Sequence, residues 1–436
     1  MIVGTRPEAI KLVPLILALR ESAIYEPIVV STGQHHQMVE EIFELAELRQ
    51  DATLYAGDRH ARLNERVATV MRRFEDFICE RFGDEPADGE HLEAALRGEY
   101  PIAVAVHGDT SSAMAAALAA FQMRIPVLHV EAGLRTGGLN LTPFPEELNR
   151  QVITCIAALH LAPTETNLQN LMRENVAVDQ VFVTGNTGID ALHWASGLEV
   201  PFRDPAVEEA VAGDQRLVVV TAHRRESWGR GLREIATGVG RLASGHPECR
   251  FVVPMHPNPQ VRDQLRGPLA EHENVLLTEP LGYAGFARLL AGCDLVITDS
   301  GGIQEEAPSL GKPVLVTRET TERAEGVAAG TLLLVGTDAD RIAAEGERLL
   351  TDADAYARMA RSPNPYGDGR AAERIVGALE HIVRGGEPPA QFGPGYTRRA
   401  VIRAAGVNVP LGPIEALEDR LSEHQRAPSG AELWPT

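Results

Sequence analysis

One stretch of the sequence, residues 293–315, combines a short apolar run with groups that could bind an anion. Residues 293–298 predict a buried strand, Asp299-Ser300-Gly301-Gly302 ends it, and residues 303–310 predict a helix. A strand that enters a helix through two glycines presents free N–H groups and a positive dipole end to an anion. The negative charge of Glu306 would repel a bare phosphate, but its carboxylate could accept hydrogen bonds from the hydroxyls of a ribose. The stretch predicts a nucleotide-diphosphate site, and a βα turn whose glycines serve only close packing remains the alternative.

Polar side chains also follow other predicted strands. Cations lie on a first helical turn (Arg6, Lys11), and acids lie after strands or before a helix (Asp109, Glu131, Glu146). A histidine lies beside two arginines (His223, Arg224, Arg225), and His256 and Ser300 follow two further strands. The cations could meet a diphosphate, and the acids could move protons. The imidazole could hold or protonate a phosphate.

Ordinary structural roles compete with several of these assignments. Asp109 could be only a helix N-cap, and Glu146 could merely suit a helix N-terminus. His107 and His129 lie inside apolar runs, which is typical of core histidines. No pair of His, Cys or carboxylate residues has metal-site spacing, and Gly-x-Gly-x-x-Gly, the Walker lysine motif and Gly-x-Ser-x-Gly are absent. We therefore expect no metal, no dinucleotide redox cofactor and no ATP site.

Length and composition restrict the class of protein. A chain of 436 residues with 44% hydrophobic and 23% charged residues predicts two globular domains. The formal charge, 41 − 61 = −20, argues against a nucleic-acid or anionic-membrane surface. Four cysteines without paired spacing indicate reduced thiols, and no membrane-spanning segment or signal peptide is visible. We expect a cytoplasmic protein.

Strand, turn and helix alternate along the chain. Strands are expected at residues 25–31, 102–107, 126–130, 217–221, 251–254 and 295–298. This alternation predicts an α/β fold with parallel sheets covered on both faces, and ligands beyond the carboxyl ends of the strands.

A break near residues 185–204 divides the pattern into two doubly wound halves, with the site expected in the cleft between them. We assign residues 1–170 to the first domain and 171–369 to the second. A helix at about 370–384 is expected to pack back on the first domain, and 385–436 is a linker and tail of unknown role. The residues alone predict an enzyme acting on a nucleotide-linked substrate with carboxylate acid/base groups.

The ordered motifs resemble those of the non-hydrolysing UDP-N-acetylglucosamine 2-epimerases. The resemblance runs from Gly4 to about Val383 and rests on GTRPEAIK, TGQHHQM, HGDT, HVEAGLRT, PFPEELNR, TETNLQNL, TGNTGIDAL, AHRRESWG, DSGGIQEEAPSLGKPVL, TTER and NPYGDG. It implies two facing Rossmann-like domains of the GT-B type with the active site between them. It also implies a homodimer that interconverts UDP-GlcNAc and UDP-ManNAc for cell-surface polysaccharide synthesis, without metal or NAD.

The chemistry of that interconversion accounts for the residue types. The C2 proton of the sugar is not adjacent to a carbonyl, so direct abstraction by a carboxylate would be slow. Once UDP leaves, C1 is oxocarbenium-like and the C2 proton is acidic enough to remove, which gives 2-acetamidoglucal. UDP and a proton then add back, with the proton arriving on the opposite face. Two faces call for two acid/base groups, and the departing diphosphate calls for positive charge.

The resemblance implies a role for each matching residue. Asp109, Glu131 and Glu146 are the acid/base carboxylates, and His223 is a catalytic group on the diphosphate side. The UDP and phosphate contacts are Arg6, Lys11, Ser300, Gly301, Gly302, Glu306 (the ribose acceptor) and Arg323. Bacterial members are similar in binding a second UDP-GlcNAc as an activator, and the residues that match its pocket are Gln34, His35, Gln37 and His256.

The chain departs from the family pattern in three places. Residues 137–142 are one residue longer than the commonest pattern, which bears on whether Glu146 or Glu147 matches the third acid. Residues 58–62 replace the usual glutamine-containing turn beside the activator pocket, and the tail after about residue 386 has no counterpart. Alternative functions are epimerisation of a UDP-diacetamido-uronic acid, hydrolysis to ManNAc and UDP, glycosyl transfer, and non-catalytic sensing of a nucleotide sugar.

Overall fold

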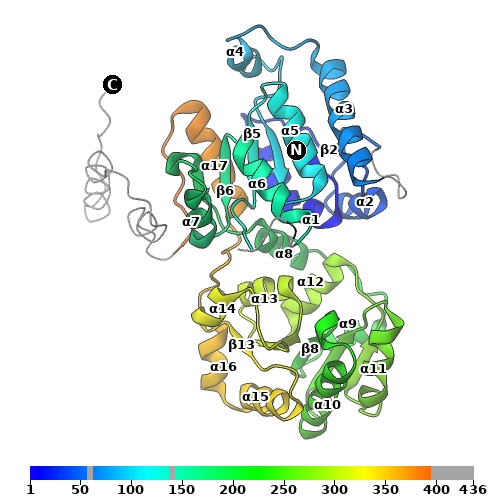
Figure 1. Ribbon diagram of the computed structural model, residues 1–436. Helices are drawn as coiled ribbons and strands as arrows, with labels where there is room; N and C mark the ends of the chain where they lie inside the picture. Colours follow the sequence, from blue (N-terminus) through cyan, green and yellow to red (C-terminus); the bar gives the residue numbers. More distant parts are fainter. Residues whose placement is uncertain (56–61, 137–140, 142, 394–436) are drawn as a thin grey trace, which may run out of the picture.

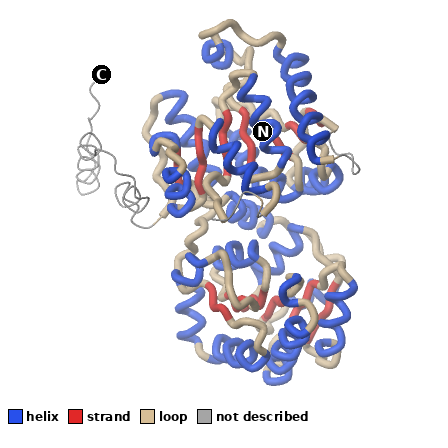
Figure 2. The backbone as a smooth tube through the Cα atoms, in the orientation of Figure 1, coloured by secondary structure: helices blue, strands red, loops and turns tan. Residues whose placement is uncertain are grey.

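The computed structural model describes residues 1–55, 62–136, 141 and 143–393. Two lobes follow one another along the chain, each with strands between layers of helices (Figures 1 and 2). Every strand pair in the described residues is parallel, which confirms the predicted α/β fold. None of the helices in these ranges combines the length and the apolar character needed to cross a bilayer.

The first lobe is built on seven short parallel strands. One sheet has the order β1 (Ile2–Val3), β2 (Val30–Ser31), β3 (Ala52–Thr53), and the other has the order β4 (Val104–His107), β5 (Val127–Val130), β6 (Leu159–Ala162), β7 (Val181–Val183). β1 contacts β4, so the strand order reverses between these two strands. The strand expected at residues 25–31 is wrong in extent, since only Val30–Ser31 pairs; Pro27 has no N–H to donate to a ladder.

Helices pack against these strands and against one another. They are α1 (Arg6–Glu21), α2 (His36–Leu45), α3 (Leu63–Phe82), α4 (His91–Leu96), α5 (Ser111–Gln122), α6 (Glu146–Ile156) and α7 (Glu165–Arg173). The alanine-rich α5 is almost wholly buried, because its small side chains let it lie close to the strands. Its first turn follows β4 directly, so the residues between β4 and α5 lie at the carboxyl edge of the sheet.

The second lobe holds a six-stranded sheet. Its order is β10 (Val275–Thr278), β9 (Arg250–Pro254), β8 (Leu217–Thr221), β11 (Leu295–Thr298), β12 (Val314–Val316), β13 (Leu332–Leu334). The sequence order reverses between β8 and β11, and in open α/β sheets the ligand crevice lies at such a reversal, beyond the carboxyl ends. The fully buried run of β8, LVVVT, is typical of a strand covered on both faces.

The helices of this lobe are α9 (Pro205–Ala212), α10 (Arg230–Gly245), α11 (Pro259–Leu269), α12 (Tyr283–Gly292), α13 (Gly301–Glu306), α14 (Ala324–Ala329), α15 (Ala339–Thr351) and α16 (Ala353–Ala360). The helix expected at residues 303–310 begins two residues earlier, at Gly301. It changes to a 3₁₀ turn at Ala307, where Pro308 supplies no N–H for the α-helical bond.

Two helices connect the lobes. α8 (Thr187–Ser196) lies between them and packs on α1 of the first lobe and α12 of the second (Figure 1). α17 (Ala371–Arg384) returns to pack on α1, and its first N–H groups are accepted by Asp190 of α8, at 3.1 Å from Ala371 and 2.8 Å from Ala372. The second lobe is therefore held to the first by helix packing at both crossings of the chain.

The described part of the expected linker runs back along the first lobe. The N–H of Phe392 donates to the carbonyl of Val183 at 2.8 Å, and the Val183 N–H donates to the Gln391 side chain at 2.9 Å. This segment therefore covers the exposed edge of β7. The tail beyond residue 393 lies outside the described residues.

Candidate active site

Glu131 and Lys11 form an ion pair at the carboxyl edge of the first sheet. Glu131 follows β5, Lys11 lies on α1, and the two side chains are hydrogen bonded. Burial by itself would raise the pKa of Glu131, but Lys11 and His107 outweigh it and lower the pKa to about 2. Burial also lowers the pKa of His107 to about 4, so this ring is neutral at pH 7 and Lys11 is the effective partner. Glu131 is thus held ionised.

The backbone aims Glu131 into this site. Its φ is +63°, a left-handed conformation that a side-chain-bearing residue rarely adopts. The carboxylate reaches to 3.7 Å from His107 Nε2 at the end of β4. Such conformations persist where the surrounding structure enforces them, and they are frequent at functional sites.

Asp109 lies between β4 and α5 and is paired with Arg150 of α6. Arg150 donates to its Oδ2 from Nη2 at 2.6 Å and from Nε at 3.0 Å. Burial raises the pKa of Asp109, Arg150 opposes this, and the nearby charges of Glu131 and Glu146 raise it further. The three predicted acids therefore lie close enough to influence one another. The N-cap of α5 is Thr110, which accepts the Ala113 N–H at 3.0 Å, so the N-cap alternative for Asp109 is wrong.

Glu146 and Glu147 begin α6 and have different surroundings. Glu147 is buried and accepts hydrogen bonds from Arg150 Nη1 at 2.7 Å and Thr136 Oγ1 at 3.2 Å. Glu146 is half-buried, and among the described residues its side chain has no hydrogen bond or ion pair. Of the two glutamates, Glu147 is thus the one engaged by described residues, and Glu146 is the one they leave unpaired. Of the lengthened segment, residues 137–140 and 142 lie outside the described residues.

His223 follows β8 in the second lobe, opposite Asp299 at the end of β11. Asp299 is fully buried, its Oδ2 accepts the His223 N–H at 2.7 Å, and its Oδ1 lies 3.3 Å from His223 Nδ1. The ring stacks on His256, with centroids 5.4 Å apart and an interplanar angle of 3°. Burial lowers the pKa of His223, while Asp299 acts to raise it.

The strand-to-helix turn of residues 300–306 lies beside Arg323. A Cβ at Gly301 would come within 2.9 Å of Arg323 Cζ, so the guanidinium would have to move to admit a side chain there. Arg323 Nε donates to Glu305 at 2.9 Å, and Glu305 also accepts from Asn186 at 2.8 Å. The turn therefore places a guanidinium directly over its first glycine.

Glu306 ends α13 with an unpartnered carboxylate. Its side chain makes no hydrogen bond or ion pair to another described residue, and its Oε1 lies 3.9 Å from the position of a Cβ on Gly302. Burial, reinforced by the neighbouring Glu305, raises the pKa of Glu306 to about 7.

Lys11 faces both lobes. Burial disfavours its charge, and the charges of Glu131, Glu305 and Glu306 more than compensate, so the pKa of Lys11 is raised. The first-lobe acids and the second-lobe turn are thus within electrostatic reach of one cation. Arg6 begins α1 one turn earlier, and its Nε is buried without a hydrogen-bond partner in the described residues.

The predicted activator residues are divided between the lobes. Gln34, His35 and Gln37 lie between β2 and the first turn of α2, where Gln34 accepts from Ser112 Oγ at 2.7 Å and Gln37 is exposed. His256 follows β9, is exposed and stacks on His223. Of the replaced turn, residues 58–61 lie outside the described residues.

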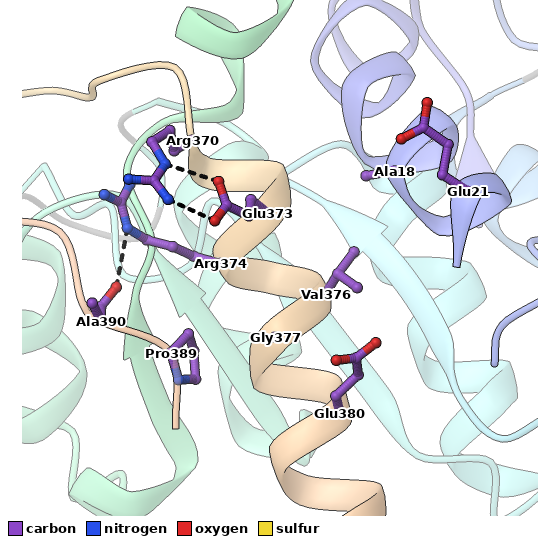
Figure 3. A pocket seen from close by; sticks show the side chains of 10 residues that line it. All are labelled: Ala18, Glu21, Arg370, Glu373, Arg374, Val376, Gly377, Glu380, Pro389 and Ala390. Carbon is purple, nitrogen blue, oxygen red and sulfur yellow. Dashed lines mark hydrogen bonds and ion pairs between the residues drawn. The ribbon is translucent and has the colours of Figure 1, made fainter. Parts of the chain in front are cut away.

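A hollow of about 500 Å³ lies away from all of these groups. It is bounded by α1, α17 and residues 389–390 (Figure 3). Its two arginines are already engaged, since Arg370 pairs with Glu373 at 2.6 Å and Arg374 with Asp368 at 2.6 Å. It contains none of the residues expected to do chemistry, so the site is assigned from the geometry above.

Sequence reasoning did not select four residues that organise the site. Arg150 donates to Asp109, and Asp299 accepts the His223 N–H. Glu305 accepts from Arg323 and is itself held by Asn186. Asp299 could have been chosen, because it follows a buried strand directly. The others become visible only when distant segments are brought together.

Two parallel-sheet lobes, with acids at one carboxyl edge and a strand–glycine–helix turn at the other, define a GT-B-like two-domain α/β enzyme. The model of one protein family, described as UDP-N-acetylglucosamine 2-epimerase, matches residues 90–380. The chain belongs to the UDP-N-acetylglucosamine 2-epimerase family, as the motif resemblance predicted.

Individual relatives match this chain over nearly their whole length. The chain is 45% identical over 384 residues to the UDP-N-acetylglucosamine 2-epimerase of Escherichia coli K12, covering 87% of this chain and 97% of that protein. The Bacillus subtilis 168 relative of the same name is 42% identical over 376 residues, covering 86% and 93%. The crystal structure of UDP-GlcNAc 2-epimerase from Neisseria meningitidis bound to UDP-GlcNAc has a TM-score of 0.76 and 39% identity, covering 87% of this chain and 98% of that one.

Proposed function

We propose that this protein interconverts UDP-GlcNAc and UDP-ManNAc without hydrolysis, by eliminating UDP and adding it back. The observation that carries the proposal is the gathering of Asp109, Glu131 and Glu146 close enough for their charges to interact. Family membership supports the substrate, and so does the relative from Neisseria meningitidis whose structure holds UDP-GlcNAc.

The second lobe would hold the UDP. Ser300, Gly301 and Gly302 would bind the diphosphate, and Glu306 would accept hydrogen bonds from the ribose. Arg323, Arg6 and Lys11 would supply the positive charge that a departing diphosphate requires. Lys11 is the cation that both lobes share, so its approach to the diphosphate would loosen its pairing with Glu131.

The first lobe would move the protons. As the C1–O bond breaks, its electron pair goes to UDP; a carboxylate takes the C2 proton and C1=C2 forms. Glu131 suits the role of base because it is ionised before substrate arrives. Its basicity would rise when Lys11 turns to the diphosphate, because burial is then left uncompensated. Asp109, which Arg150 positions, and Glu146 would serve the opposite face and the return of the proton.

The proposal is tested by incubating the enzyme with UDP-GlcNAc alone in heavy water and resolving the products by NMR. UDP-ManNAc that carries deuterium at C2 is expected. Epimerised sugar without that label would contradict elimination, and accumulation of ManNAc and UDP would favour hydrolysis. An unchanged substrate, with turnover of a UDP-diacetamido-uronic acid instead, would move the specificity to that sugar.

Glu306 provides a prediction about pH. A carboxyl group whose folded pKa is about 7 binds its proton more tightly when folded, so its contribution to stability is full below pH 4.5 and is lost as pH rises to about 7. Glu306→Gln should therefore raise the melting temperature by about 2–4 °C at pH 8 and leave it nearly unchanged at pH 4.5. The same variant should weaken UDP binding in calorimetry because the ribose acceptor is lost. A uniform shift at both pH values would contradict this assignment.

We also propose a homodimer that binds a second UDP-GlcNAc as activator through Gln34, His35, Gln37 and His256. The stacking of His256 on His223 supports a link between that pocket and the diphosphate side. Initial rates in the UDP-ManNAc to UDP-GlcNAc direction, with no added UDP-GlcNAc, should show a lag that a trace of UDP-GlcNAc removes. Absence of a lag would contradict the activator, and light scattering at a single chain mass would contradict the dimer.

A further inference from the structure

His223 and Asp299 are joined across the strand-order reversal of the second sheet. β8 and β11 are neighbouring strands; His223 follows β8 and Asp299 follows β11. The fully buried Asp299 accepts backbone N–H groups of His223 at 2.7 Å and Arg224 at 2.8 Å through Oδ2. One carboxylate oxygen therefore fixes the start of the loop that carries the imidazole.

The other carboxylate oxygen lies close to the ring. Asp299 Oδ1 is buried, has no hydrogen-bond partner that meets normal geometry in the described residues, and lies 3.3 Å from His223 Nδ1. A buried carboxylate oxygen without a hydrogen-bond donor raises the free energy of the folded state, and an Nδ1–H beside it lowers that free energy again. The favoured tautomer of His223 therefore carries its proton on Nδ1.

The remaining surroundings hold the ring in place and leave its other nitrogen open. His256 stacks on one face at an interplanar angle of 3°, and Trp228 Nε1 donates to the His223 carbonyl at 3.0 Å. The side chain is 36% exposed, and Nε2 makes no hydrogen bond to a described residue. The charges that act on the ring are those of Asp299, which favours imidazolium, and of His256 and Arg224, which oppose it.

We propose that Asp299 is the positioning residue of His223, fixing its Nδ1–H tautomer and stabilising the imidazolium when Nε2 takes up a proton. This inference rests on the proposed function, in which His223 acts at the diphosphate. When the C1–O bond breaks, the electron pair passes to the diphosphate oxygen, and the proton on Nε2 hydrogen bonds to that oxygen. Nε2 takes up this proton from solvent before the C1–O bond breaks. The proton stays with the imidazole or is shared with the diphosphate oxygen until UDP adds back, and then returns to solvent.

The direct test is Asp299→Asn. The amide oxygen can still accept the two backbone N–H groups, but the amide NH₂ then faces Nδ1 and imposes the opposite tautomer. Turnover of UDP-GlcNAc should fall about 100-fold or more, as expected for loss of the correct tautomer, while KM changes less than about threefold. In ¹⁵N-histidine NMR spectra, with His223→Gln used for assignment, the His223 signals should change from the Nδ1–H to the Nε2–H pattern.

Asp294→Asn is the matched control. Asp294 also caps a strand of this sheet, accepting the Leu217 N–H at 2.8 Å, but it has no contact with the imidazole. It should keep the wild-type rate and tautomer. In the His223→Gln background, Asp299→Asn should reduce turnover no further, because Asp299 acts through the ring.

Two results would overturn the proposal. One is a wild-type His223 with its proton on Nε2, a measurement that needs no Asp299 variant to fold. The other is an Asp299→Asn enzyme with wild-type turnover and tautomer, which would make Asp299 only a backbone cap. A wild-type protein without epimerase activity would instead contradict the proposed function. The NMR measurement of the His223 tautomer would still test the His223–Asp299 pairing in that case.

Discussion

Replacing Glu131 with glutamine should reduce turnover of UDP-GlcNAc by at least about 10³-fold and leave the affinity for UDP within about threefold. The amide cannot accept the C2 proton, whereas the carboxylate is already ionised beside Lys11. UDP affinity should survive because the phosphate-side cations are unchanged and Lys11 loses a competing partner. Turnover is measured by NMR of the two nucleotide sugars, and affinity by calorimetry.

The control is Glu208→Gln, which removes a carboxylate paired with Arg288 in the second lobe, outside the candidate site. It should retain the wild-type rate. Deuterium incorporation at C2 from heavy water provides a second readout, and it should disappear with Glu131→Gln. Turnover within tenfold of wild type would remove Glu131 from the catalytic assignment.

Glutamine at Glu146 should lower activity, whereas glutamine at Glu147 should lower stability. Glu146→Gln should lower turnover by roughly 10²–10⁴-fold with little change in the melting temperature, because this half-buried carboxylate has no partner among the described residues. Glu147→Gln should cost about 3 kcal/mol of folding free energy, because the buried Arg150 loses one of its two carboxylate partners. Both variants are measured by thermal unfolding, which reports stability, and by turnover of UDP-GlcNAc.

Each variant acts as the other's control, since both replace a neighbouring glutamate in the first turn of α6. A stable Glu147→Gln protein that has lost catalysis, together with an active Glu146→Gln protein, would transfer the acid/base role to Glu147. Arg150→Lys would then show whether Asp109 depends on the same network, because lysine cannot keep both of the guanidinium contacts.

The elements and the candidate residues could largely be predicted from local patterns. Buried runs such as Leu217–Thr221 predict parallel strands, and the polar residues after them indicate the carboxyl edge of the sheet, where ligands bind in such folds. Ordered motifs identified the family. The errors were at element ends, where Pro27 shortened one strand and Pro308 turned the last helical turn into 3₁₀, and such boundaries are the least reliable part of a local pattern.

The burial and the partners of the candidates were decided only by the tertiary structure. The sequence by itself determined that acids, cations and two glycines follow strands, because hydrophobic periodicity and turn chemistry are properties of neighbouring residues. Several of the pairings of these groups depend on partners far along the chain. Lys11 meets Glu131 across 120 residues, and Asp299 meets His223 across 76.

Nothing local distinguishes Glu146 from Glu147. Arg150 is three residues from Glu147 on one helix but reaches Asp109 only because α6 packs beside α5. Likewise, only the tertiary structure brings the Arg323 guanidinium against Gly301 and leaves the Glu306 side chain without a hydrogen bond or ion pair to a described residue. Ion pairs and burial follow from the way the topology brings segments together, and the sequence pattern reports only which groups are available.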